Sequence, residues 1–182
     1  MLRVIDGGLR REMTYGSLRI VAAPRTSRPF AVEALVVEED TWLIMSAEPQ
    51  MADAEEHPIR LMTDVINTVK EKAGSVKVRG GDPLRFLAIV HDVDSEPTWR
   101  EEWIQSALSN ILQEAVSRKL TAVGLPLLGT RHGRLEDLRF AELLAAALLA
   151  TDISPLNRLW LIAPLERNAT LIDRLQALLN PV

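Results

Sequence analysis

The sequence contains no cysteine among its 182 residues. This absence excludes disulfide bonds, thiolate nucleophiles and cysteine-based zinc sites, and it is typical of proteins that work in a reducing compartment. Long apolar runs are also missing, since none approaches the roughly 20 residues that a membrane-spanning helix needs. The first residues show no basic region followed by an apolar run, so we expect no signal peptide. We therefore expect a cytoplasmic protein without a membrane partner.

A basic excess is missing too. The net charge is −4, which argues against a general nucleic-acid-binding protein. The charges are unevenly distributed: residues 1–30 hold six arginines and two acids, whereas residues 31–57 hold eight acids and no lysine or arginine. The simpler interpretation is a solvated basic arm beside a solvated acidic loop. The alternative is that the two segments meet in the fold or in a dimer.

What the sequence does contain is the composition of an ordinary globular protein, with 47% hydrophobic and 25% charged residues. The length favours a single domain over residues 1–182. No internal repeat, low-complexity segment or linker divides the chain. Residues 1–17 show no clear period, so we expect them to be loosely ordered or to form one short strand.

Apolar segments of strand length alternate with amphipathic segments of helix length over most of the chain. The predicted strands cover residues 18–24, 32–38, 41–47, 85–93, 121–129 and 158–164. The second and third of these are close enough in sequence to form a hairpin. The predicted helices cover residues 58–73, 97–120, 135–150 and 166–179. This alternation predicts an α/β fold, a three-layer α/β/α arrangement with a mixed, mostly parallel sheet of about six strands.

The connection Gly129–Arg134 joins a predicted buried strand to a predicted buried helix. Ligands of parallel sheets bind outside the carboxyl ends of the strands. Backbone amides of a glycine-containing turn, together with a helix N-terminus, form a site for anions. Arg131 and Arg134 would add charge-assisted hydrogen bonds, and His132 would add a donor or an acid or base. The alternative is a tight turn whose polar side chains are only solvated.

Two other patterns allow more than one interpretation. The segment His91–Asp94 offers ligand types for zinc or magnesium at a strand end. Strand geometry points His91 and Asp92 to opposite faces, so we interpret this segment as a strand end and predict no metal site. The predicted helix 135–150 is more apolar than one buried face requires, which indicates either a fully buried helix or a homodimer surface.

Four segments resemble, in order and spacing, the second half of a macro domain. They are LAIVHDV (87–93), WIQSALSNILQEAVSRKLTAVGLPLLGT (103–130), HGRLEDLRFAELLAAAL (132–148) and RLWLIAP (158–164), of which GLPLLGT is the most specific part. The resemblance implies a macro-like α/β/α fold, related to the amino-terminal domain of leucine aminopeptidases. Macro domains bind ADP-ribose and related nucleotides, and some of them hydrolyse ADP-ribose linkages.

The resemblance also implies which residues would contact a ligand. The loop that holds the distal phosphate and ribose would consist of Gly129, Thr130, Arg131, His132 and Gly133. The segment VEALVVEED (32–40) would take the place of the family's strand and Asn-containing loop, which puts Glu38 and Asp40 near the distal ribose. The family's Asn pair is absent, and the acidic segment QMADAEEHP (50–58) replaces its first glycine-rich loop.

These observations lead to three hypotheses about function. The first is a divergent macro-like domain that binds a nucleotide or ADP-ribose-type phosphate ligand through the Gly129–Arg134 loop, without a cofactor. The second is a macro fold without a ligand that acts as a protein-interaction or regulatory module, as a homodimer or with a protein partner. The third is a hydrolase of ADP-ribose linkages. Since the sequence shows no positioned base or ribose clamp, we expect binding rather than catalysis and assign no catalytic residue.

Overall fold

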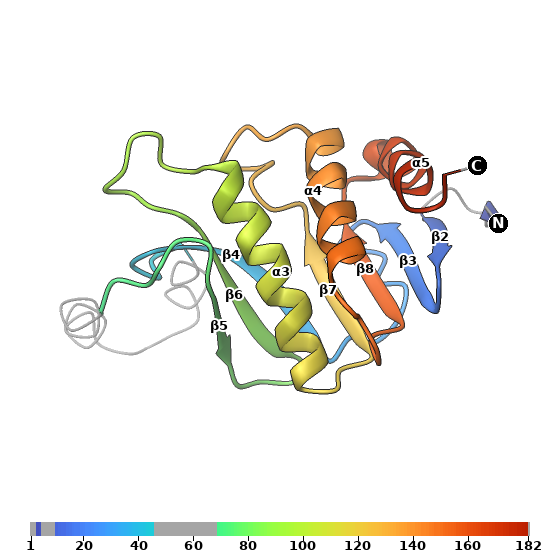
Figure 1. Cartoon of the computed structure of the whole chain (residues 1–182), viewed down its shortest axis with the longest axis horizontal. Helices are drawn as coiled ribbons and strands as arrows, with labels where there is room; N and C mark the ends of the chain where they lie inside the picture. The colour runs from blue at the N-terminus through green and yellow to red at the C-terminus, as the bar shows by residue number, and fades with distance from the viewer. Residues whose placement is uncertain (1–2, 5–9, 46–68, 182) are drawn as a thin grey trace.

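The computed structural model describes residues 3–4, 10–45 and 69–181. It shows an eight-stranded sheet in the order β1-β2-β3-β8-β7-β4-β6-β5 (Figure 1). The strands are β1 (Arg3–Val4), β2 (Arg11–Tyr15), β3 (Leu18–Ala23), β4 (Ala34–Asp40), β5 (Val76–Arg79), β6 (Leu84–His91), β7 (Ala122–Pro126) and β8 (Arg158–Ile162). The helices are α3 (Glu101–Ser117), α4 (Asp137–Ala150), α5 (Asn168–Leu179) and the short 3-10 helix η1 (Leu165–Arg167).

The middle of the sheet is parallel. Strands β3, β8, β7, β4 and β6 run in the same direction, so their carboxyl ends share one edge. Strand β5 pairs antiparallel with β6 on one side, and β2 and β1 continue the sheet antiparallel to β3 on the other. The mixed, mostly parallel sheet predicted from the sequence is therefore confirmed, with eight strands rather than about six.

Helices α3, α4 and α5 lie side by side on one face of the sheet (Figure 1). Their buried side chains, such as Ile104 and Leu144, form one core with alternate strand residues, such as Phe86 and Leu161. Because successive strand residues point to opposite faces, the intervening residues point to the other side of the sheet. No helix in the described part of the chain is long and apolar enough to span a membrane.

Most of the apolar side chains of helix α4 are buried inside the protein. Leu143, Leu144 and Leu148 are buried in the core, which accounts for the strongly apolar pattern of the sequence. Leu138 and Leu149 are the exceptions, with 42% and 60% of their surface exposed. The sequence pattern allowed two alternatives, a fully buried helix or a homodimer surface. Burial within the chain explains most of the apolar residues of this helix.

The strand predicted for residues 41–47, and its hairpin with the preceding strand, are wrong for residues 41–45, while residues 46–47 lie outside the described residues. Residues 41–45 form a turn instead. The carboxylate of Asp40, which is 1% exposed, accepts hydrogen bonds of 2.7–3.0 Å from the backbone amides of Trp42, Ile44 and Met45. These bonds end strand β4 and fold the chain back. Strand β4 pairs with β6 and β7 instead, which are distant in sequence.

The N-terminal part is more regular than predicted. Strand β2 lies within residues 1–17 and pairs with β3 across a turn at Gly16, whose φ of 56° favours glycine. Strand β5 has no counterpart in the sequence prediction. Residues 58–68 of the predicted helix 58–73, and the acidic segment 50–58, lie outside the described residues, while residues 69–72 are not helical.

Candidate functional site

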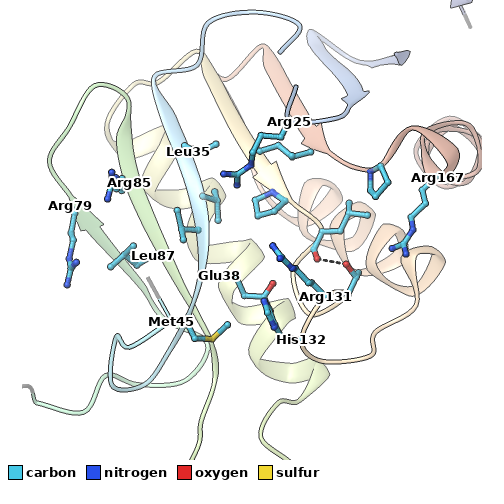
Figure 2. Close-up of a pocket in the computed structure, with 17 residues that line it drawn as sticks. Arg25, Leu35, Glu38, Met45, Arg79, Arg85, Leu87, Arg131, His132 and Arg167 are labelled. Carbon is cyan, nitrogen blue, oxygen red and sulfur yellow. Dashed lines mark hydrogen bonds between the residues drawn. The ribbon is translucent and has the colours of Figure 1, made fainter. Parts of the chain in front are cut away.

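A cavity of about 1020 Å³ opens at the carboxyl edge of the parallel strands (Figure 2). Most of these strands contribute to it: Arg25 follows β3, Glu38 lies near the end of β4, Arg131 follows β7 and Arg167 follows β8. This edge is where ligands of parallel α/β sheets bind, and the volume suits a ligand of nucleotide size.

The floor of the cavity is apolar and belongs to the face of the sheet opposite α3, α4 and α5. Its residues come from four neighbouring strands: Leu35, Val37, Leu87, Pro126 and Ile162. The adjacent strand residues, such as Phe86 and Leu125, are buried in the helix-covered core. The cavity therefore extends from the carboxyl edge over an apolar sheet surface, on which a flat ring could lie.

Arginine dominates the polar part of the cavity wall. The five arginines are Arg25, Arg79, Arg85, Arg131 and Arg167. Glu38 is the only carboxylate among the described lining residues. Since the whole chain carries a net charge of −4, this concentration of positive charge favours an anionic ligand at this place.

Most of these arginines have no partner among residues 3–4, 10–45 and 69–181. Arg167 donates a hydrogen bond of 3.1 Å to Asp137. The side chains of the other four make no hydrogen bond or ion pair with any residue that the structure describes. Four arginines outside the cavity, by contrast, each pair with a glutamate: Arg19, Arg118, Arg139 and Arg174. With respect to the described residues, the five N–H donors of each cavity arginine are therefore unused or nearly so, and they suit an anionic ligand.

The predicted loop Gly129–Arg134 is held by hydrogen bonds to its own chain. The backbone amides of Gly133 and Leu135 both donate to the Gly129 carbonyl at 3.0 Å. The Thr130 amide donates to the Leu127 carbonyl at 3.2 Å, and the Gly129 amide donates to the Glu38 carboxylate at 3.3 Å. Three amides on which a phosphate would depend, those of residues 129, 130 and 133, are thus already satisfied.

Both glycines of this loop allow close packing. Gly129 has a φ of 76°, and a Cβ there would lie 2.3 Å from Cδ1 of Ile104 in α3. A Cβ at Gly133 would lie 2.8 Å from the Trp99 ring and 2.8 Å from the Gly129 carbonyl oxygen. A positive φ and such short approaches require glycine. The glycine signal of the sequence therefore reflects the packing of the loop on α3 and on the residues that precede it.

The structure brings only some of the predicted ligand residues together. Thr130, Arg131, His132 and Glu38 line the cavity. The others lie outside the lining: Gly129, Gly133, Arg134 and Asp40. Asp40 is buried and its carboxylate is used by the turn after β4, while Arg134 is exposed with a φ of 58°.

Four lining arginines were not predicted from the sequence: Arg25, Arg79, Arg85 and Arg167. They lie on four different elements or connections, so no local motif contains them. One signal was available for two of them. The turn sequence RGGDP, which begins with Arg79 and ends two residues before Arg85, is typical of a hairpin, and a hairpin would have placed these two side chains opposite each other.

Glu38 connects the cavity wall to a buried histidine. Nε2 of His91, a residue that is 5% exposed, hydrogen-bonds to Oε1 of Glu38. The ring of His132 approaches the His91 ring edge-on, with 6.1 Å between the ring centroids. Oε2 of Glu38 accepts the bond from Gly129. His91 and Gly129 together fix the direction of the Glu38 carboxylate.

Asp92 points away from this cluster, as strand alternation predicts. It accepts hydrogen bonds from the hydroxyls of Thr41 and Ser95, at 3.1 and 2.8 Å, and forms an ion pair of 2.9 Å with Lys70. The hydrogen bond from Lys70, supported by those from Ser95, the Asp94 amide and Thr41, lowers the pKa of Asp92 to about 2. Within residues 3–4, 10–45 and 69–181, no three His, Asp or Glu side chains converge as a metal site would require.

No protein-family model and no curated protein matches this chain. Several solved structures match the chain. The Oceanobacillus iheyensis macrodomain with ADP matches with a TM-score of 0.69 and 12% identity over 95% of this chain and 98% of that chain. The macro domain of ganglioside induced differentiation associated protein 2 matches with a TM-score of 0.64 and 14% identity over 89% of this chain and 84% of that chain. The Thermus aquaticus DarG macrodomain matches with a TM-score of 0.57 and 17% identity over 80% of this chain and 98% of that chain. At these identities the likeness concerns the fold alone, and the fold that the sequence resemblance implied is confirmed.

Proposed function

Because the chain has the fold of a macro domain, we propose that its cavity binds a nucleotide of the ADP-ribose type. The observation that carries this proposal is the set of arginines, four of them without a partner among the described residues, above an apolar floor at the carboxyl edge of the sheet. The Oceanobacillus iheyensis macrodomain has been solved with ADP and, as a variant, with ADPR, which supports the same ligand class here.

Arginine side chains, rather than loop amides, would hold the diphosphate. In Figure 2, Arg25 and Arg131 extend into the space above the sheet from two different strand ends. Guanidinium groups form bidentate, charge-assisted hydrogen bonds with phosphate oxygens. His132 lies beside Arg131 in the wall and offers one further donor. The proposal thus keeps the predicted position of the anion and two predicted donors, Arg131 and His132, and it replaces the loop amides by further arginines.

The test is calorimetric titration of the wild-type chain and an Arg131→Ala variant with ADP-ribose, ADP and NAD. Losing a charge-assisted hydrogen bond to phosphate is expected to weaken binding about 10- to 100-fold. The control is Arg118→Ala, which removes the same charge from the far end of α3, where Arg118 pairs with Glu114. We expect this control to bind as the wild type does. An absence of heat with all three nucleotides would contradict the proposal.

One contact favours a second function, a macro fold without a nucleotide that serves as a protein-interaction or regulatory module. The Glu38 carboxylate already occupies the Gly129 amide, as an intramolecular anion would. The arginines would then contact an acidic protein segment or a second copy of the chain. Sedimentation velocity over a wide concentration range tests the homodimer. A monomer at every concentration would eliminate that form of the second function.

Hydrolysis of ADP-ribose linkages has less support from the cavity. Glycosidic and related hydrolyses commonly use a pair of carboxyl groups on either side of the bond that breaks. The described lining residues include the carboxylate of Glu38 alone. We therefore propose binding and not catalysis as the role of this site.

A further inference from the structure

Arg79 and Arg85 occupy directly opposite positions in the antiparallel pair of β5 and β6. Side chains at such positions share a face of the sheet and lie close together, and like charges there are destabilising. The next register pair, Val78 with Phe86, contacts the helix-covered core, so both arginines point to the other face and line the cavity. Neither has a hydrogen-bond or ion-pair partner within the described ranges. A bound anion would turn this repulsion into attraction.

This pair lies at a different end of the cavity from the other arginines. Arg85 is in register with Leu35 on β4, and Glu38, near the carboxyl edge, comes three residues after Leu35. At 3.3 Å per residue, the two levels are about 10 Å apart. In Figure 2, Arg79 and Arg85 stand on one side of the cavity, and Arg131 and Arg167 stand on the other.

The floor between these two ends is apolar, since Leu35, Val37 and Leu87 form it. The cavity therefore combines positive charge at both ends with an apolar surface in the middle. A ligand that matches this arrangement has two anionic groups, one for each end, and a flat or apolar part that lies on the floor. A nucleotide that carries a second phosphate on the ribose of its 5′-diphosphate meets this requirement, because the ribose separates the two anionic groups and the attached base is flat.

We propose that Arg79 and Arg85 form a second anion subsite that recognises a phosphate on the adenosine ribose. The preferred ligand is then an ADP-ribose-type nucleotide with a ribose phosphate in addition to its diphosphate. This inference rests on the proposed function, because a diphosphate at the carboxyl edge is what places the nucleoside over the apolar floor. A phosphate monoester carries a charge of about −1.5 to −2 at pH 7, which two guanidinium groups can balance.

The experiment compares two ligands that differ by one phosphate, ADP-ribose and its adenosine 2′-phosphate form. Calorimetry on the full chain is expected to show about 10- to 100-fold tighter binding of the phosphorylated ligand. The double variant Arg79→Gln/Arg85→Gln is expected to bring the two affinities together. The control variant Arg118→Gln, which changes the charge far from the cavity, is expected to keep the preference.

The outcomes separate the two proposals. If the wild type binds both ligands equally, the second subsite is overturned while the proposed function stands. If neither ligand binds, the proposed function fails. The subsite is then tested by titration of the chain with inorganic pyrophosphate as a simple anion. Shifts of the Arg79 and Arg85 side-chain Nε signals in the nuclear magnetic resonance spectrum would support an anion site at the pair, and unchanged signals would overturn it.

A stability measurement distinguishes a ligand site from a structural role. If Arg79 and Arg85 repel each other in the free chain, Arg79→Gln is expected to raise the melting temperature by about 1–3 °C. A gain in stability combined with a loss of the ligand preference supports the subsite. A lower melting temperature would show that the pair stabilises the fold, and it would overturn the argument from repulsion.

Discussion

The Glu38 carboxylate accepts a hydrogen bond from the Gly129 backbone amide, with 3.3 Å between Oε2 and N. This bond joins the end of strand β4 to the loop that follows β7. Behind it, His91 holds the second oxygen of the same carboxylate. The lone carboxylate among the described residues of the cavity wall therefore lies at the amide that a phosphate would otherwise approach. A ligand phosphate has to bind beside this negative charge.

We expect Glu38→Gln to bind ADP more tightly than the wild type does. The glutamine oxygen can still accept a hydrogen bond, while the charge next to the ligand phosphate is gone. A unit charge at about 4 Å in water contributes about 1 kcal/mol, which corresponds to a gain of about 5-fold in affinity. Calorimetry at low salt measures this gain, and it should shrink as salt screens the charge.

The control for this prediction is Glu114→Gln, which removes the same charge near the end of α3, where Glu114 pairs with Arg118. Its affinity for ADP should equal that of the wild type. Weaker binding by Glu38→Gln would contradict the prediction. It would show instead that the carboxylate accepts a hydrogen bond from a hydroxyl of the ligand.

Gly129→Ala is expected to destabilise the fold strongly. The new Cβ would lie 2.3 Å from Cδ1 of Ile104, whose side chain is fully buried, and the backbone has a φ of 76°. Backbone strain and overpacking together predict a loss of about 2–4 kcal/mol in the free energy of unfolding. Urea denaturation followed by circular dichroism measures this loss.

Two further variants separate the strain from the clash. Gly16 also has a positive φ, of 56°, but a Cβ there meets no atom within 4 Å. Gly16→Ala should therefore show the strain alone, about 1 kcal/mol. In an Ile104→Val background, which lacks the clashing Cδ1, the cost of Gly129→Ala should fall by about 1 kcal/mol. Equal costs for the two glycine substitutions would contradict the packing role of Gly129.

Local patterns were sufficient to predict helices α3, α4 and α5 and the inner strands. The stripe of Ile104, Leu108 and Ile111 has the period of a helix packed on one side, and all three are buried in α3. Strand β6 from Phe86 onward and most of β7 and β8 are buried on both faces, which explains their nearly continuous apolar sequences. In these elements each residue's neighbours along the chain already determine its environment.

The cavity could not be predicted in the same way. Arg25 and Arg131 follow β3 and β7, which are separated by β8 in the sheet and by about a hundred residues in the chain. Only the order of the parallel strands brings them to one edge. Asp40 shows a different case, since only the family resemblance placed it near the ribose of a ligand. Its burial and its three amide donors depend on the turn that follows.

Asp92 links the pH to the stability of the region around the end of β6. The hydrogen bond from Lys70 is the main cause that lowers its pKa in the folded chain to about 2. In the unfolded chain, an aspartate has a pKa of about 3.9. A carboxyl group whose pKa is lower in the folded state stabilises the fold above the unfolded value. This contribution is lost as the pH falls from about 4 to about 2.

We therefore expect the free energy of unfolding to include about 2 kcal/mol from Asp92 at pH 5, and this part to be mostly gone near pH 2. Asp92→Asn should be less stable than the wild type at pH 5 and should lose less stability on acidification. Urea denaturation at several pH values between 5 and 2 measures both effects. Asp82→Asn, at an exposed position in the β5–β6 turn, is the control and should keep the wild-type pH dependence. If Asp92→Asn lost as much stability in acid as the wild type, the ion pair with Lys70 would not be what stabilises this region.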